Sequence, residues 1–210
     1  DRTALAPATL PAERSGLLTQ ASVLTLLSRT DNTSVVARGL FVRGALLCLP
    51  KIGAPPTALA GQIMALLKAD MSERERAEVR ATTSPCSSCH FQFDRFGLLL
   101  ESYDPIGRHR TEIKGEPIDS TTSLDGLGVF TGTVADAVSF AQAAAASPDF
   151  TACLTRNLIA YGTGDDALTT SDCQVSDSVG QLPPSPTMRD LVRAATSSQA
   201  LTHRSVETAP

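Results

Sequence analysis

The chain has 210 residues, of which 42% are hydrophobic and 4% aromatic, and its formal net charge is −4 at pH 7. This length suits one large domain or two small ones with a packed core. The negative charge argues against a nucleic-acid partner, and no apolar stretch reaches the roughly 18–20 residues that a membrane-spanning helix needs.

Apolar periodicity and capping residues predict a mainly α-helical chain with long loops and one minor β-hairpin. In the N-terminal half we expect helices over residues 15–28, with Ser15 as N-cap, and over 35–49, 56–69 and 72–81. Residues 96–111 begin as a helix that breaks at Asp104–Pro105, and residues 110–121 alternate around Gly115 as a hairpin does.

The C-terminal half is also predicted to be helical. Thr133 is expected to cap a helix over 134–146, and Ser147 to cap the next, with Pro148 in its first turn and an end at Gly162. Residues 162–186 form a long polar excursion, after which Thr187 is expected to cap a helix over 188–198.

The stretch "SPCSSCHFQFDRFG", residues 84–97, contains two cysteines three positions apart and a histidine directly after the second. Cys86-Ser87-Ser88-Cys89-His90 fits the pattern for covalent attachment of c-type haem. Two thiols one helical turn apart add to the two vinyl groups on one porphyrin edge, and the adjacent imidazole becomes the proximal iron ligand. The motif therefore predicts one haem c held by Cys86, Cys89 and His90.

Other interpretations of the motif compete with this one. A Cys86–Cys89 disulfide is possible, although it leaves His90 unexplained. A zinc site needs four ligands, whereas the chain has no second C-x-x-C pair and its other histidines, His109 and His203, stand apart. A thioredoxin-type redox pair follows a strand, and here a charged helix precedes the cysteines.

The remaining cysteines fit an oxidising compartment, as haem attachment also requires, so we expect a periplasmic, extracellular or cell-surface location. We predict a disulfide between Cys153 and Cys173 that ties the polar excursion to the preceding helix. Cys48 is then left over, either as a small buried hydrophobe or as the partner of a cysteine outside this chain.

The segment "RERAEVRATTSPCSSCHFQFDRFGLLLESYDPIGRHR", residues 74–110, resembles the haem-motif domain of the planctomycete-type cytochrome family of large exported bacterial proteins. Residues 16–28 and 37–50 resemble the stretch before that motif, and "DGLGVFTG" and "SPDFTACLTRNLIAYGTG" resemble the family's small C-terminal domain. The family positions fall on Arg74 and Arg76, Cys86 to His90, Asp94 and Gly97, Glu101, and Asp104 to Arg110. Arg95 is a departure, because members often carry proline there.

The resemblance implies a cytochrome c-like helical haem domain over residues 1–120 and a small helical C-terminal domain over 121–210 that packs on it. It also implies that the chain is the C-terminal portion of a longer precursor. The partner would be a redox protein or the N-terminal remainder of that precursor.

Further haem contacts are open at this stage. Arg108 and Arg110 are candidates for holding the haem propionates, because a planar guanidinium matches a carboxylate, and a structural salt bridge is the alternative. Phe91, Phe93 and Phe96 could pack on the porphyrin or in an ordinary core. Met188 is our first choice of distal ligand, although an open distal position is also possible; the other candidates are Met64, Met71, His109 and His203.

Two functions follow from these predictions. The first is a monohaem electron-transfer module, which needs no catalytic residues. The second is a peroxidase-like haem enzyme with an open distal site, where His109 or Glu101 would serve as the distal base or donor. A structural haem within an interaction domain is a third, simpler possibility.

Overall fold

The computed structural model describes residues 9–54, 61, 64–127 and 130–203. Its described residues are mainly helical, as predicted, with two small antiparallel sheets of two strands each. The chain forms two compact units, one within Asp1–Leu40 and Ala54–Gln142 and the other within Phe41–Gly53 and Ala143–Pro210. The predicted haem domain over residues 1–120 and C-terminal domain over 121–210 stay a prediction.

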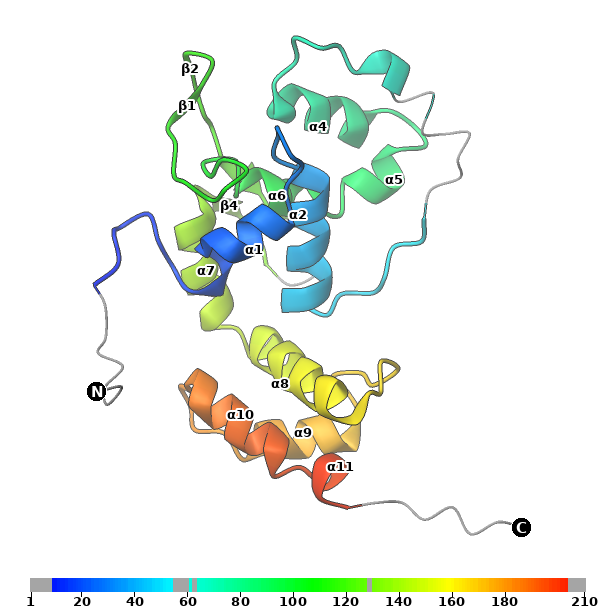
Figure 1. Cartoon of the computed structure of the whole chain (residues 1–210). Helices are drawn as coiled ribbons and strands as arrows, with labels where there is room; N and C mark the ends of the chain where they lie inside the picture. Colours follow the sequence, from blue (N-terminus) through cyan, green and yellow to red (C-terminus); the bar gives the residue numbers. More distant parts are fainter. Residues whose placement is uncertain (1–8, 55–60, 62–63, 128–129, 204–210) are drawn as a thin grey trace. The chain divides into compact units, whose positions relative to one another are not determined.

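Elements up to residue 145 are drawn in blue to yellow-green in Figure 1. The helices are η1 (Leu17–Thr19), α1 (Ala21–Leu26), α2 (Val35–Phe41), η2 (Val42–Leu46), α4 (Glu73–Thr82), α5 (Ser87–His90), α6 (Asp94–Leu98) and α7 (Ala137–Ala145). Strands β1 (Glu112–Ile113) and β2 (Glu116–Pro117) form the predicted hairpin, with Ile113 opposite Glu116. Strands β3 (Thr122–Ser123) and β4 (Thr133–Val134) form a second pair that the sequence did not predict.

Several predicted boundaries change. Residues 15–28 form a 3₁₀ turn and a short helix. The Ser15 N–H donates to the Thr19 hydroxyl, and Ser15 does not act as the N-cap. Thr133 lies in a strand, and the cap of α7 is Asp136, whose carboxylate accepts the Ser139 N–H at 2.7 Å. Half of the helix predicted over 56–69 lies outside the described residues, and within the described half Gly61 and residues 64–66 are helical.

Helices α2 and α6 approach each other through two glycines. A Cβ at Gly39 would lie 2.8 Å from the carbonyl carbon of Phe93, and a Cβ at Gly97 would lie 2.7 Å from that of Val35. Both distances are shorter than side chains tolerate, so only glycine permits this separation. The contact holds the segment after the Cys86–His90 motif against α2.

Arg38, also on α2, is completely buried in the first unit. Its guanidinium donates to the carbonyl oxygens of Leu100, Tyr103 and Asp104 at 2.6, 2.7 and 2.9 Å, and to the Ser28 hydroxyl at 3.0 Å. Burial lowers the pKa of Arg38 to about 10, and the nearby Glu101 carboxylate opposes that shift. The side chain is therefore charged at neutral pH, and it satisfies backbone groups of a loop that has no regular secondary structure.

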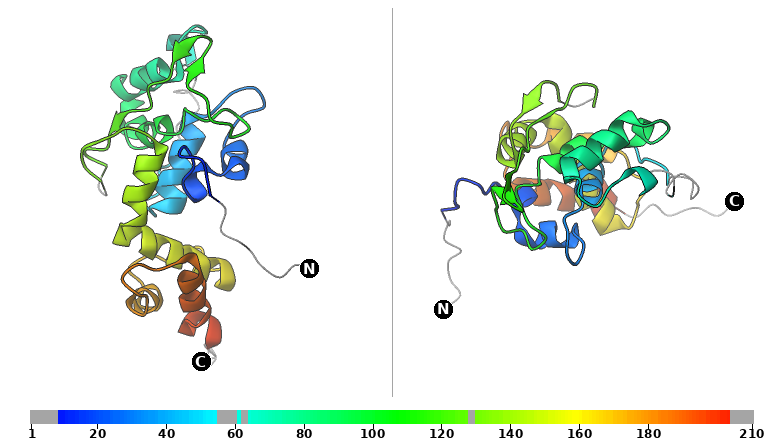
Figure 2. Two further views of the ribbon diagram at one scale, coloured as in Figure 1. Left: turned by 90° about the vertical axis from the view of Figure 1, so that its left-hand side faces the viewer. Right: turned by 90° about the horizontal axis from the view of Figure 1, so that it is seen from above.

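The second unit is built on α8 (Pro148–Thr163), α9 (Cys173–Gly180), α10 (Met188–Thr196) and α11 (Gln199–Thr202). Figure 2 shows α8 beside α9 and α10, and a core of five buried side chains joins them: Ile159, Ala160, Leu168, Val175 and Ala195. Ser147 and Thr187 cap α8 and α10 as predicted. Helix α8 continues past Gly162 to Gly164, whose φ of 75° suits the left-handed end of a helix.

Helix α9 corrects the prediction of an unstructured excursion over 162–186. Its sequence "CQVSDSVG" is polar, but Val175 is fully buried in the core of the second unit. Within the described residues, none of the helices is long and apolar enough to cross a membrane.

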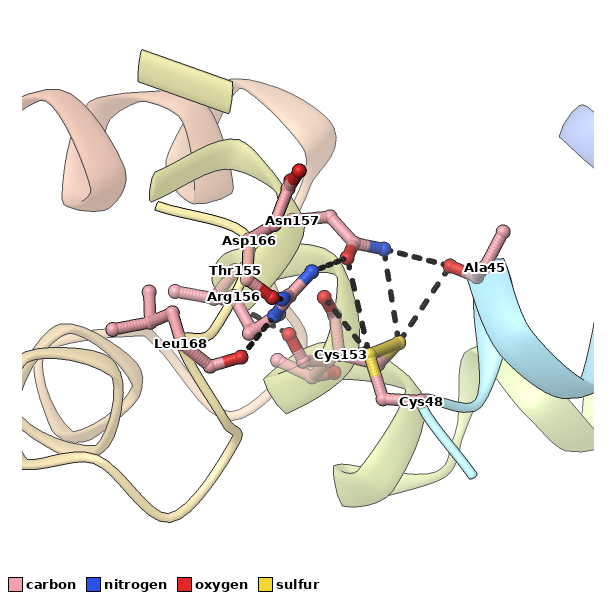
Figure 3. Close-up of a disulfide and its surroundings, with 9 residues drawn as sticks. Ala45, Cys48, Cys153, Thr155, Arg156, Asn157, Asp166 and Leu168 are labelled. Atoms are coloured by element: carbon pink, nitrogen blue, oxygen red, sulfur yellow. Dashed lines mark hydrogen bonds between the residues drawn. A yellow bond between two sulfur atoms is a disulfide. The ribbon is translucent and has the colours of Figure 1, made fainter. Parts of the chain in front are cut away.

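The predicted Cys153–Cys173 disulfide is wrong. Cys153, which is fully buried, is bonded to Cys48, and their Cα atoms are 5.3 Å apart (Figure 3). Asn157 on α8 donates to the carbonyl oxygen of Ala45 at 2.7 Å and so holds η2 beside the bridge. Cys173 is an exposed free thiol at the start of α9. The bridge therefore joins residues 105 positions apart within the second unit.

We expect Gly39→Ala to destabilise the chain by about 3 kcal/mol, since the new methyl group overlaps the Phe93 carbonyl. The matched control is Gly44→Ala on η2, where a Cβ meets no atom within 4 Å. It should be neutral or stabilise by up to about 1 kcal/mol, because alanine favours helix. Urea unfolding followed by circular dichroism measures both, and equal effects would contradict the close contact.

Removing the disulfide should also be measurable. A Cys48→Ser/Cys153→Ser double variant is expected to lose about 4–5 kcal/mol of unfolding free energy, as the chain-entropy model gives for a loop of this length. Cys173→Ser should leave stability unchanged. Peptide mapping without reductant should recover Cys48 linked to Cys153, and a Cys153–Cys173 peptide would show that the pairing is wrong.

Candidate functional site

The Cys86–His90 motif occupies one short helix. Cys86 is the N-cap of α5, and the His90 N–H donates to the Cys86 carbonyl oxygen at 3.0 Å. Residues three apart on a helix lie on the same side, so Cys86 and Cys89 share one side of this turn. Both are free, half-buried thiols, and the Cys86–Cys89 disulfide does not form.

Helix α4 leads directly into this motif. It begins with a capping box in which the Ser72 hydroxyl accepts the Glu75 N–H, and the Glu75 carboxylate accepts the Ser72 N–H at 2.7 Å. The Glu75 carboxylate accepts hydrogen bonds from both the N–H and the hydroxyl of Ser72, and these two bonds lower the pKa of Glu75. The helix contacts both α5 and α6 and carries Arg80 at its buried side.

A buried carboxylate orients the motif histidine. Asp94 is 1% exposed, and its Oδ2 lies 2.8 Å from Arg80 Nε and 3.1 Å from His90 Nδ1. A carboxylate paired with arginine only accepts hydrogen bonds, so we assign the proton to His90 Nδ1. In the neutral ring this leaves Nε2 with a free lone pair, which is what a metal ligand requires.

The aromatic residues around the motif divide into two groups. Phe96 is fully buried and its ring centroid is 5.6 Å from that of Phe140, so it belongs to the core. Phe93 is buried with its ring centroid 4.9 Å from that of His90. Phe91 is half-buried, and the Arg95 guanidinium lies 4.1 Å from its ring centroid.

A cavity of about 380 Å³ opens beside His90. Its walls come from α4, the α5–α6 segment and the β3–β4 pair: Arg74, Ala77, Glu78, Ala81, Thr82, His90, Asp94, Arg95, Leu98, Thr121, Thr122, Ser123 and Thr133. Two arginines stand among these residues. Arg74 donates to the carbonyl oxygens of Asp119 and Thr121, and Arg95 to those of Ser123 and Asp125.

Sequence reasoning did not single out Arg74 and Arg95 as cavity residues. The available signal was the departure at Arg95, where the family resemblance leads one to expect proline. Only the fold brings residues 121–123 and Thr133 to the same cavity as α4, and so makes these two side chains neighbours of His90.

The predicted residues Arg108 and Arg110 lie elsewhere in the first unit. Arg110 pairs with the buried Glu101, with Nη2 and Oε2 3.6 Å apart, and both line a second cavity of about 370 Å³ that does not include His90. Burial raises the pKa of Glu101, although the Thr33 hydroxyl, Arg38 and Arg110 oppose this shift. Arg108 is exposed, and its N–H donates to the Asp104 carboxylate at 2.8 Å. Their role at a propionate stays a prediction.

The distal-ligand candidates are spread over the chain. Met188 is the first residue of α10 in the second unit and is 55% exposed. Met71 lines the second cavity, Met64 is 66% exposed, and His203 is exposed. His109 packs edge-on against Tyr103, with ring centroids 5.5 Å apart. The assignment of Met188 stays a prediction.

Among the described residues, no group of three or more His, Cys, Asp or Glu side chains could hold a metal ion. A structural zinc site would need four such ligands. Haem iron is different, because the porphyrin supplies four nitrogens and the protein only one or two axial ligands.

Comparison with known proteins gives one match. Residues 14–113 are similar to the family described as PSCyt3, protein of unknown function (DUF1588). The matched region is just under half of the 210-residue chain and contains α1 to α6, including Cys86, Cys89 and His90. No curated protein and no solved structure matches the chain.

The interaction energy between the Arg80 and Asp94 side chains can be measured directly. Either Arg80→Gln or Asp94→Asn alone should destabilise the chain by about 3–5 kcal/mol, because each leaves a buried charge without its partner. The double variant should lose clearly less than the sum of the two. Urea unfolding of all four proteins gives the coupling energy, and strictly additive losses would show that the two side chains do not interact.

Proposed function

We propose that this chain is an exported c-type cytochrome module with one covalently attached haem and a function in electron transfer. One observation carries the proposal: two free thiols share one side of a helical turn, directly before a histidine whose Nδ1 is held by a buried carboxylate. Thioether attachment needs both thiols unpaired, and axial ligation needs a free Nε2.

The residues around His90 fit such a group. The adjacent cavity of about 380 Å³ lies within the range of 300–1,000 Å³ that ligand sites occupy, although it is at the lower end. Its walls include the apolar side chains of Ala77, Ala81 and Leu98. Arg74 and Arg95 lie on the same walls, and a guanidinium is well suited to the acidic groups at a porphyrin edge.

When bound, a haem c supplies a one-electron couple between ferric and ferrous iron. The protein's part is to keep the surroundings of that couple fixed. His90 is restrained by Asp94, Asp94 by Arg80, and the motif helix by its contact with α4. Groups that already lie in place rearrange little when the charge changes, which favours electron transfer.

Residues proposed for a peroxidase-like site lie apart from this cavity. Neither His109 nor Glu101 is among its lining residues, and Glu101 is engaged by Thr33 at 3.1 Å and by Arg110. These contacts give no support to the peroxidase-like site, and none of the distal-ligand candidates lines this cavity either.

Export is supported by the Cys48–Cys153 disulfide, since such bonds persist in oxidising compartments. We place the chain in the periplasm, outside the cell or at the cell surface. Its partner would be a redox protein or the preceding part of its own precursor.

The test is to produce the full 210-residue chain in a host that matures c-type cytochromes. We expect a red protein whose intact mass exceeds that of the polypeptide by one haem, with pigment that resists acid-acetone extraction. The Cys86→Ala/Cys89→Ala variant should lose the pigment, whereas the matched control Cys173→Ala should keep it. A colourless product with the mass of the bare chain would end the proposal.

Carbon monoxide then separates the two functions. An electron carrier with both axial positions filled should show sharp α and β bands when reduced and no spectral change on adding carbon monoxide. Rapid binding of carbon monoxide would instead support the haem-enzyme alternative and contradict the electron carrier.

A further inference from the structure

The buried Asp94 carboxylate makes its contacts through one oxygen only. Arg80 Nε donates to Oδ2 and His90 Nδ1 lies 3.1 Å from the same oxygen, whereas the buried Oδ1 has no hydrogen-bonding partner among the described residues. Among the ion pairs of the described residues, Asp94 takes part in those with Arg80 and His90 alone. Within the part of the chain that the structure describes, Arg80 is thus the one other side chain that contacts the oxygen facing the imidazole.

The position of this carboxylate is fixed from two helices. Asp94 is the first residue of α6, and Arg80 reaches it from the last turn of α4. The side chains of Asp94 and Arg80 are 2% and 8% exposed, so water screens their interaction little. The carboxylate therefore keeps its orientation towards His90.

We propose that Asp94 is a positioning residue that lowers the reduction potential of the site by acting through His90. This inference rests on the proposed haem at Cys86 and Cys89. A carboxylate that accepts the Nδ1–H makes the opposite nitrogen, Nε2, a more basic ligand. A more basic Nε2 favours the more positively charged ferric iron, so the oxidised form is stabilised.

Arg80 holds the Asp94 carboxylate in place beside His90. Because Arg80 shares Oδ2 with His90, the imidazole receives only part of the carboxylate's accepting capacity. The pair thus provides a fixed hydrogen bond to the ligand without placing an uncompensated charge beside it.

The first test uses the unmodified full chain, without haem. Nitrogen-15 NMR of labelled histidine in mildly alkaline buffer, where free imidazole is neutral, distinguishes the two tautomers of His90. We expect the proton on Nδ1 in the wild-type chain and a shift towards Nε2 in Asp94→Ala. A wild-type His90 that carries its proton on Nε2 would overturn the inference whether or not haem binds.

The second test measures the midpoint potential of the haem-loaded chain. Asp94→Asn replaces the charged acceptor with a neutral one and should raise the ratio of reduced to oxidised protein about tenfold, which is about 59 mV for a one-electron couple. The matched control is Glu112→Gln on β1, which removes an exposed carboxylate that lines neither cavity. It should change the ratio by well under tenfold.

If Asp94→Asn does not fold, the Arg80→Gln/Asp94→Asn double variant takes its place, since it leaves no buried charge unpaired. It should raise the potential in the same direction. An unchanged potential in a haem-loaded variant would overturn this inference alone, whereas a chain that takes up no haem would overturn the proposed function.

Discussion

A single buried carboxylate oxygen joins three helices of the first unit. Asp94 Oδ2 on α6 binds Arg80 of α4 and His90 of α5, so the position of the imidazole depends on where the two neighbouring helices lie. The four-residue α5 is too short to be stable by itself. Its geometry is therefore imposed by tertiary contacts, and the same contacts define the wall of the cavity beside it.

A second buried charge extends this constraint to the rest of the unit. Arg38 binds three carbonyl oxygens of residues 100–104 and lies 4.0 Å from Glu101. The loop after α6 is thus fixed against α2, which in turn meets α6 at Gly39 and Gly97. Buried charges and closely approaching glycines thus contribute, together with the apolar core, to how these short helices pack.

Local chemistry made part of this structure predictable. The caps Ser147 and Thr187 act through side chains that bind their own first turn, so the sequence shows them directly. The hairpin around Gly115 is equally local. The attachment motif could be recognised because its residues are consecutive.

Other features depend on contacts between distant residues, and the sequence could not show them. The pairing of Cys48 with Cys153 depends on η2 and α8 being neighbours, whereas sequence proximity favoured Cys173. Helix α9 is mostly polar. Its apolar residue Val175 is buried because side chains of α8 and α10 pack against it. Arg74 and Arg95 line the cavity only because the fold brings β3 and β4 to the same cavity as α4.

The bridge between Cys48 and Cys153 has a consequence for biosynthesis. In a chain delivered from its N-terminus, Cys48 appears first, and Cys86 and Cys89 both follow before its native partner arrives. Oxidation before Cys153 has emerged would leave Cys86 and Cys89 as the partners available to Cys48 in this part of the chain, and the proposed haem attachment needs both of them unpaired. On the proposed function, a reductant or isomerase is therefore expected to act on this polypeptide until residue 153 has emerged.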